Sequence, residues 1–291
     1  MNSTQPLHIL LTNDDGHKAP GIQALHRVLK QAGHSVTMVA PSTEKSATGM
    51  SVTSRRNLAL EKIEESSWHL DGQPADTVLV ALRHLLQDNP PDLVVSGINF
   101  GPNLGTDLHI SGTFGAAAIA AILGVPAIAV SAGMRHDEVD HSPRRFPSTY
   151  KVLEPAAKLV CSVVESLNDS KGSDGRLLPK NILLNINYPA LPMEKIKGIL
   201  HPEISGGHVI ELGYHRCDQT GHVVPGYYSG IDPEQPQKEE GDIRAHLEGY
   251  ITISAVKPSW NAPTNQCEEI SKRLKGLAPI SNPCLTNPDD D

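Results

Sequence analysis

Two adjacent carboxylates, Asp14 and Asp15, follow a short apolar run, residues 9–11, and are themselves followed by Gly16. An apolar run that ends in a turn signal is typical of a buried parallel strand, and ligands bind at the carboxyl ends of such strands. Two like charges side by side are unstable together unless a positive group joins them. The pair is therefore the first candidate for chemistry, with a cation as its expected partner.

Polar side chains also follow the next two predicted core strands. Ser46 lies in the polar loop after the strand 35–40, and Asn99 lies in a Gly-rich loop after the strand 92–96. Carboxylate, hydroxyl and amide groups offer only oxygen ligands, and neither His nor Cys joins them. Such a set suits Mg²⁺ or Mn²⁺ rather than a structural zinc ion.

An anion cradle is expected beside this cation. The loop 97–105 contains three glycines, whose backbone N–H groups can approach an anion closely, and it includes Gly101 and Asn103. The segment Ser111-Gly112-Thr113 then begins an Ala-rich helix, where the first N–H groups and the positive end of the helix dipole attract negative charge. A cation beside such a cradle favours metal-assisted phosphate chemistry.

Each of these features also has an ordinary structural explanation. An Asp-Asp pair often forms a turn, an asparagine in a Gly-rich loop is usually a turn former, and Ser-Gly-Thr at a helix start is commonly a cap. What favours a functional site is that all of them follow successive strands at one edge of the predicted sheet.

The elements that must position these residues form an α/β fold. Strands that alternate with helices are typical of a doubly wound, mostly parallel sheet with helices on both faces. We expect core strands at 9–11, 35–40, 92–96, 127–130, 182–186 and 249–254, a hairpin within 58–70, and helices from Pro20, from Pro74 through Leu86, at 115–123 and at 148–167. Residues 206–241 are rich in Gly, His, Pro and charge, which indicates a hairpin or arm rather than core.

Composition excludes some functions and favours others. The net charge of -8 over 291 residues argues against a protein that binds nucleic acid duplexes or anionic membranes in general. The run 114–134 carries no charge and is about as long as a spanning helix, but Gly124-Val125-Pro126 divides it, which predicts a helix followed by a strand. The four cysteines are widely separated, which favours free thiols in a reducing cytoplasm, and residues 1–6 do not resemble a signal peptide.

The segments that carry this chemistry resemble the SurE family (survival protein E) in order and spacing, from about Leu7 to Ser131. The matching segments are Thr12-Asn13-Asp14-Asp15-Gly16, Ala40-Pro41 with Glu44-Lys45-Ser46-Ala47-Thr48-Gly49, Gly72-Gln73-Pro74-Ala75-Asp76, Ser96-Gly97-Ile98-Asn99-Phe100-Gly101-Pro102-Asn103 and Ser111-Gly112-Thr113. A weaker similarity continues through Asn185-Ile186-Asn187-Tyr188-Pro189 and Gly249-Tyr250-Ile251-Thr252-Ile253-Ser254.

The resemblance implies a metal-dependent phosphatase that acts on nucleoside monophosphates, and some relatives also act on 3'-nucleotides and short polyphosphate. It implies a Rossmann-like core and one divalent ion, Mg²⁺ or Mn²⁺. The implied metal ligands are Asp14, Asp15, Ser46 and Asn99. Asp14, Asp15 and Asn99 are the expected catalytic residues, and the expected phosphate-binding residues are Gly101, Asn103, Ser111, Gly112 and Thr113.

The resemblance also implies a protruding C-terminal β-hairpin arm used to form a homodimer or homotetramer. We therefore expect residues 1–200 to form the catalytic core and 201–248 the arm. Residues 249–280 should supply a late strand and a C-terminal helix that returns to the core or to a partner subunit, and 281–291 a disordered tail. Two departures from the family pattern, Ile110 and Met50, bear on substrate preference.

Several alternatives stay open at the level of sequence. Asp14 could position or deprotonate an attacking water, or a carboxylate could form an aspartyl-phosphate. A signalling receiver domain also places two acidic residues after its first strand, but it needs an aspartate acceptor where this chain has Asn99. A nucleotide-binding sensor without turnover is a further class. A Rossmann dehydrogenase is disfavoured because no G-x-G-x-x-G follows the first strand.

Overall fold

The computed structural model describes residues 5–135, 138, 147–217, 221–232, 234–259 and 264–275. The chain divides into two compact units, Met1–Pro258 and Ser259–Asp291. The second unit contributes helix α6 (Thr264–Arg273) to the described residues. The tail predicted at 281–291 lies outside them.

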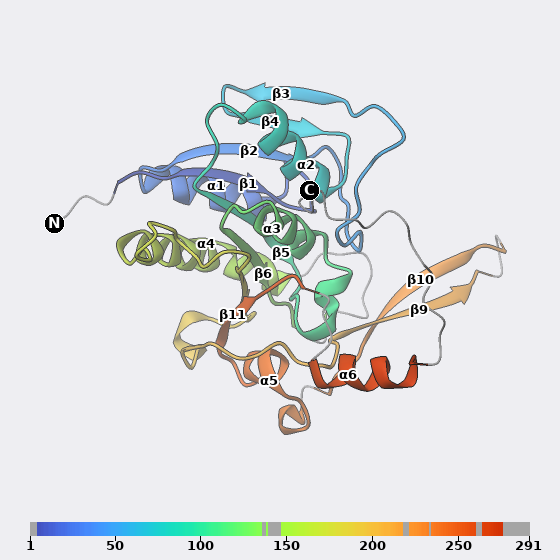
Figure 1. The fold of residues 1–291 in the computed structure, drawn as a ribbon. Helices are drawn as coiled ribbons and strands as arrows, with labels where there is room; N and C mark the ends of the chain where they lie inside the picture. The colour runs from blue at the N-terminus through green and yellow to red at the C-terminus, as the bar shows by residue number, and fades with distance from the viewer. Residues whose placement is uncertain are drawn as a thin grey trace. The chain divides into compact units, whose positions relative to one another are not determined.

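A nine-stranded sheet forms the centre of the first unit, in the order β3-β4-β2-β1-β5-β6-β7-β11-β8 (Figure 1). Its strands are β1 (His8–Thr12), β2 (Ser35–Pro41), β3 (Leu60–Glu64), β4 (Ser67–Leu70), β5 (Leu93–Phe100), β6 (Ala127–Ala132), β7 (Leu183–Tyr188), β8 (Ile199–Leu200) and β11 (Ile251–Val256). Strands β4, β2, β1, β5, β6 and β7 pair in parallel, whereas β3 and β11 are antiparallel to β4 and β7. The predicted mostly parallel α/β sheet is therefore confirmed, and the carboxyl ends of β1, β2 and β5 meet at one edge.

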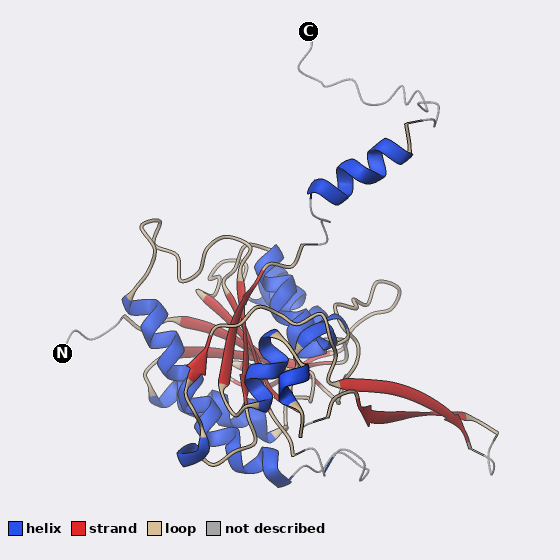
Figure 2. Cartoon of the chain, turned by 90° about the horizontal axis from the view of Figure 1, so that it is seen from below, coloured by secondary structure: helices blue, strands red, loops and turns tan. Residues whose placement is uncertain are grey.

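Helices cover both faces of this sheet (Figure 2). Helices α1 (Pro20–Gln31) and α4 (Pro147–Asp169) pack in one apolar cluster with the sheet, and α2 (Pro74–Val80) and α3 (Gly112–Ile122) pack in a second cluster. Helix α1 starts with a proline at its first position, and its apolar residues at helical spacing form the buried stripe: Ile22, Leu25, Val28 and Leu29. Because the sheet is doubly wound, helices on both faces begin near the edge where the parallel strands end.

Two predicted elements differ in detail. The helix expected from Pro74 through Leu86 is α-helical only to Val80, and Ala81–Leu85 (η1) is a π-helical turn in which the Leu86 N–H donates to the Ala81 carbonyl at 2.8 Å. The wider turn brings Ala81 and Leu86 to the same buried side. The run 114–134 is a helix that ends at Ile122 and a strand from Ala127, as predicted.

The strand predicted at 92–96 is longer, because β5 continues to Phe100. Its pairing with β6 shifts register between Ser96 and Asn99: Ser96 faces Ala129 and Asn99 faces Ser131. Asn99 therefore lies in the last part of a strand rather than in a free loop.

A two-stranded antiparallel hairpin, β9 (Ile210–Arg216) and β10 (Val223–Ser229), projects away from the sheet (Figure 1). It is the arm predicted within 206–241, and its role in assembly stays a prediction. The short helices η4 (Met193–Lys195), η5 (Pro236–Lys238) and α5 (Gly241–Leu247) flank it in sequence. Among the helices of the described ranges, none combines the length and apolar character needed to cross a bilayer.

Candidate metal and phosphate site

The turn after β1 is built by Asn13 and Gly16. The Asn13 side chain donates to the Gly16 carbonyl at 3.0 Å and accepts the Gly16 N–H at 3.2 Å, and Gly16 has a φ of +96°, which favours glycine. This closed turn presents Asp14, which is 3% exposed, and Asp15, which is partly buried, at the edge of the sheet.

Asp14 lies against the N-terminus of α3. The Thr113 hydroxyl donates to Asp14 Oδ1 at 2.5 Å. Gly112 packs so close that a Cβ there would lie 2.9 Å from Asp14 Cβ and 3.0 Å from Asp14 Oδ2. The backbone carbonyl of Asp14 accepts the N–H of Lys45 at 2.7 Å, which brings the loop after β2 to the same turn.

Asp15 faces the end of β5. Its Oδ2 accepts the N–H of Phe100 at 3.3 Å, directly after Asn99. The Asn99 amide nitrogen donates to the Gly101 carbonyl at 2.8 Å. That bond orients the side chain and leaves its oxygen as the atom that can bind a cation.

Ser46 lies on the loop that Lys45 ties to Asp14, and its hydroxyl donates to Glu44 Oε1 at 2.8 Å. Three residues further along the loop, the Gly49 N–H donates to the Ile110 carbonyl at 2.9 Å, and Ile110 directly precedes the cap of α3. The contact with Glu44 was not expected from the sequence, although the Glu-x-Ser spacing could have indicated it.

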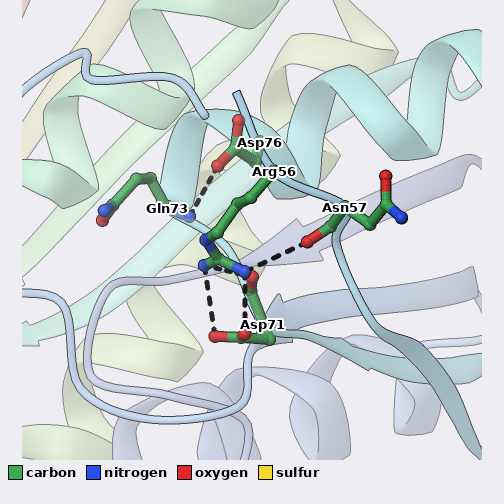
Figure 3. Close-up of polar contacts among 5 residues, drawn as sticks. All are labelled: Arg56, Asn57, Asp71, Gln73 and Asp76. Atoms are coloured by element: carbon green, nitrogen blue, oxygen red, sulfur yellow. Dashed lines mark hydrogen bonds and ion pairs between the residues drawn. The ribbon is translucent and has the colours of Figure 1, made fainter. Parts of the chain in front are cut away.

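The far end of this loop is fastened at the start of α2 (Figure 3). The Arg56 guanidinium donates to Asp71 Oδ2 at 2.8 Å and to the Asn57 carbonyl at 3.2 Å. Asp76 accepts the N–H of Thr53 at 2.9 Å through one oxygen and the N–H of Gln73 at 2.8 Å through the other. The segment that carries Ser46 is therefore held at both ends.

The start of α3 offers donors for an anion. Ser111 caps the helix, because its Oγ accepts the N–H of Phe114 at 3.0 Å, so the ordinary capping explanation holds for that hydroxyl. Gly112 and Thr113 occupy the first two helical positions, where backbone N–H groups have no acceptor within the helix. Gly112 and the Thr113 hydroxyl both lie against Asp14.

Gly101 and Asn103 have structural partners. The Gly101 N–H donates to the Ala132 carbonyl at 2.9 Å. Asn103 is buried; its N–H donates to Asn187 Oδ1 at 2.8 Å and its side-chain amide to Ser131 Oγ at 2.9 Å. Its carbonyl accepts the side-chain amides of Asn185 and Asn187. These bonds anchor the loop to β6 and β7, and phosphate binding by Gly101 and Asn103 stays a prediction.

His17 follows Gly16 at the edge of the site. Its ring stacks on His69, with centroids 4.8 Å apart, and its Nδ1 lies 3.4 Å from the Pro41 carbonyl. Burial lowers the pKa of His17, and the neighbouring His69 lowers it further, whereas the Pro41 carbonyl raises it. Burial therefore disfavours the charged form of this ring beside the carboxylates.

The oxygen-only set fits a hard divalent cation. Asp14 and Asp15 supply two carboxylates, and Mg²⁺ in proteins commonly takes one or two carboxylates and keeps several waters. Within the described residues, no three His, Cys, Asp or Glu side chains gather in a way that could hold a metal ion. A site here therefore depends on Asp14 and Asp15 together with neutral oxygen ligands.

Comparison with known proteins gives one consistent family. The family model described as "Survival protein SurE" matches residues 9–209. A protein of Carboxydothermus hydrogenoformans named "5'-nucleotidase SurE" is 41% identical over 258 residues, 86% of this chain and 90% of that protein. One of Desulfitobacterium hafniense with the same name is 38% identical over 253 residues, again 86% and 90%. The crystal structure of the SurE protein from Aquifex aeolicus superposes with a TM-score of 0.70 at 31% identity, covering 92% of this chain and 99% of that one.

Proposed function

The chain belongs to the SurE family, and we propose that it is a 5'-nucleotidase that hydrolyses nucleoside 5'-monophosphates to nucleoside and inorganic phosphate with a divalent metal ion. The names of its relatives support the reaction. The observation that carries the proposal is the hydrogen bond from Thr113 to Asp14, because it joins the expected metal ligand to the expected phosphate-binding turn.

Asp14, Asp15, Ser46 and Asn99 would hold the cation, either Mg²⁺ or Mn²⁺. When bound, such an ion polarises a phosphate oxygen and offsets the negative charge of the transferring group. The chain's own contribution is positional: Thr113 fixes the rotamer of Asp14, and the Phe100 N–H orients Asp15.

The phosphate would be bound by the N–H groups of Gly112 and Thr113 at the positive end of α3. Asp14 then lies next to the bound group and positions or deprotonates the attacking water. Phosphoryl transfer needs mainly positioning and neutralisation of charge, so this small set of groups suffices. An aspartyl-phosphate is the competing mechanism, and labelled phosphate that stays on acid-quenched protein would identify it.

The proposal also covers further substrates, assembly through the hairpin and a cellular location. Phosphate on a 3'-hydroxyl or at the end of short polyphosphate presents the same terminal group to the site. Large apolar side chains are exposed on the described part of the hairpin, namely Tyr214 at 69%, Val223 at 67% and Val224 at 36%, which supports its use in a homodimer or homotetramer. A cytoplasmic location stays a prediction from the separated cysteines.

The proposal is tested by phosphate release from AMP and GMP with Mn²⁺ or Mg²⁺. Asp14→Asn keeps an oxygen that can accept the Thr113 hydroxyl but removes the charge, so hydrolysis should fall on the order of 100-fold or more while the fold is retained. Asp88→Asn, an exposed aspartate on the amino side of β5, is the matched control and should stay active. Nucleotide binding without phosphate release in the wild-type protein would instead identify a sensor.

A further inference from the structure

Two buried aspartates, Asp107 and Asp242, take no part in the chemistry proposed above. Asp107 lies in the short helical turn η2 (Gly105–His109), which leads into Ser111, and Asp242 lies at the start of α5. The two residues are 5% and 0% exposed. Burial raises the pKa of both carboxyl groups, and backbone N–H donors are the main groups that oppose this shift.

Asp242 bridges η2 and the segment that leads into the hairpin. Its Oδ2 accepts the N–H of Gly105 at 3.0 Å, and its Oδ1 accepts the N–H of Ser205 at 2.8 Å. We call residues 203–210 the hairpin base. Each carboxylate oxygen of Asp242 thus bonds to a different segment, one to η2 and one to the hairpin base.

Asp107 makes the second bridge with a single oxygen. Its Oδ2 accepts the N–H of Val209 at 2.9 Å and that of Ile210 at 3.1 Å, where β9 begins. The backbone carbonyl of Asp107 accepts the N–H of Ser111 at 3.1 Å. One residue therefore bonds to the hairpin base through its side chain and to the cap of α3 through its main chain.

The backbones of η2 and the hairpin base also touch directly. The Thr106 N–H donates to the Gly207 carbonyl at 2.7 Å. Gly105 has a φ of +53°, and a Cβ there would lie 2.2 Å from the same Gly207 oxygen. No side chain larger than hydrogen fits between the two segments at this point.

We propose that Asp107 and Asp242 are positioning residues that tie the hairpin base to the N-terminus of α3, so that the placement of the hairpin sets the placement of the phosphate-binding turn Ser111-Gly112-Thr113. This inference rests on the proposed function, because it takes that turn as the binder of the substrate phosphate. It assigns the two buried acids a role in substrate binding without contact to the substrate.

The same chemical change should act differently at the two positions. In Asp242→Asn, one oxygen becomes an NH₂ group that faces an N–H donor, so one bridge bond must break. In Asp107→Asn, the remaining oxygen can still accept both N–H groups, whereas Asp107→Ala removes the acceptor. We expect Asp242→Asn and Asp107→Ala to lower kcat/KM for AMP by roughly 10- to 100-fold, and Asp107→Asn to restore most of the loss seen in Asp107→Ala.

Inhibition by inorganic phosphate separates positioning from mere destabilisation. A displaced turn raises the inhibition constant for phosphate and the KM for AMP, whereas a smaller folded fraction lowers only the apparent kcat. Two glycine variants test the same contact by steric means. Gly105→Ala places a Cβ against the Gly207 carbonyl oxygen and should act like Asp242→Asn. Gly207→Ala, whose Cβ would lie 3.5 Å from its nearest neighbours, should act like the wild type.

Amide hydrogen exchange gives a readout that does not need activity. We expect Asp242→Asn to speed exchange both in the hairpin base and at residues 111–114. An unchanged phosphate inhibition constant in folded Asp242→Asn, with unchanged exchange at 111–114, would overturn the inference. A wild-type protein that releases no phosphate from any nucleotide would overturn the proposed function instead, and the exchange experiment would still test the tie.

Discussion

Gly112→Ala adds one methyl group between Asp14 and α3. Its Cβ would lie 2.9 Å from Asp14 Cβ, 3.0 Å from Asp14 Oδ2 and 3.1 Å from Pro74 Cγ. Carbon atoms prefer a separation of about 3.5 to 4.0 Å, so one of these groups must move by several tenths of an ångström. Pro74 is held in α2, so the displacement falls on the carboxylate or on the first turn of α3.

The expected effect on activity is large, whereas the expected effect on stability is small. A misplacement approaching 1 Å at a reacting group costs on the order of 100-fold in rate, which is about 2.7 kcal/mol of transition-state stabilisation. Alanine is favoured over glycine in a helix by up to about 1 kcal/mol, and Gly112 does not need a positive φ. The variant should therefore lose activity while its melting temperature stays near that of the wild type.

The assay is phosphate release from AMP over a range of nucleotide and Mn²⁺ concentrations, with thermal unfolding of the same samples. Gly206→Ala is the neutral control, because nothing lies within 4 Å of its Cβ. Gly115→Ala is the contrasting control in the same helix, because its Cβ would lie 2.2 Å from the Gly49 carbonyl oxygen and should lower stability as well as activity.

Two results would refute this reasoning. Wild-type kcat/KM in a folded Gly112→Ala protein would show that catalysis does not depend on the close packing of Asp14 against this turn. A loss of stability as large as that of Gly115→Ala would show that the added methyl group acts on the fold and not on the carboxylate.

Two further predictions concern Thr113 and His246. Thr113→Val removes the hydroxyl that donates to Asp14, a charge-assisted bond of about 1.5 to 3 kcal/mol, so kcat/KM should fall about 10-fold or more. Thr113→Ser keeps the hydroxyl and should stay close to wild type. Equal kinetics of the two variants would contradict this. His246 is partly buried, and desolvation lowers its pKa from 6.5 to about 4. The unfolded chain therefore binds a proton below pH 6.5, which the folded protein binds only below about pH 4. The contribution of His246 to the free energy of unfolding is complete above pH 6.5 and should fall by roughly 3 kcal/mol as the pH drops to 4. Urea unfolding of the wild type and of His246→Leu at pH 7 and 4.5 measures this, and the variant should show the smaller pH dependence.

The sheet could be predicted because its signals are local. Apolar runs that end in Gly, Pro or Asp mark β1, β2 and β6, and helical spacing marks α1 and α4. The extent of β5 could not be predicted, because the Gly-rich segment after Ser96 reads as a loop. Its pairing with β6 depends on a neighbouring strand that the local pattern does not include.

The candidate site could be inferred from the sequence as a set of residues, whose role stays a prediction, but not as a set of bonds. Because three predicted strands end at one edge of the sheet, we expect the residues that follow them to lie together, namely Asp14, Asp15, Ser46 and Asn99. The partner of Asp14 is Thr113, 99 positions away, and the partner of Gly105 is Asp242, 137 positions away. Such pairs depend on how helices and loops pack over the sheet, so the pattern of apolar residues along the chain does not predict them.

The register shift between Ser96 and Asn99 has a consequence for how the chain can change in length. Strand β5 advances three residues there while β6 advances two, so β5 carries one extra residue, a bulge. Side chains alternate between the faces of a strand, so Ser96 and Asn99, three positions apart, share a face only because of this extra residue. A single-codon deletion at Gly97 or Ile98 would thus leave Asn99 opposite Ser131 but remove the bulge that bends the strand beside Asp15.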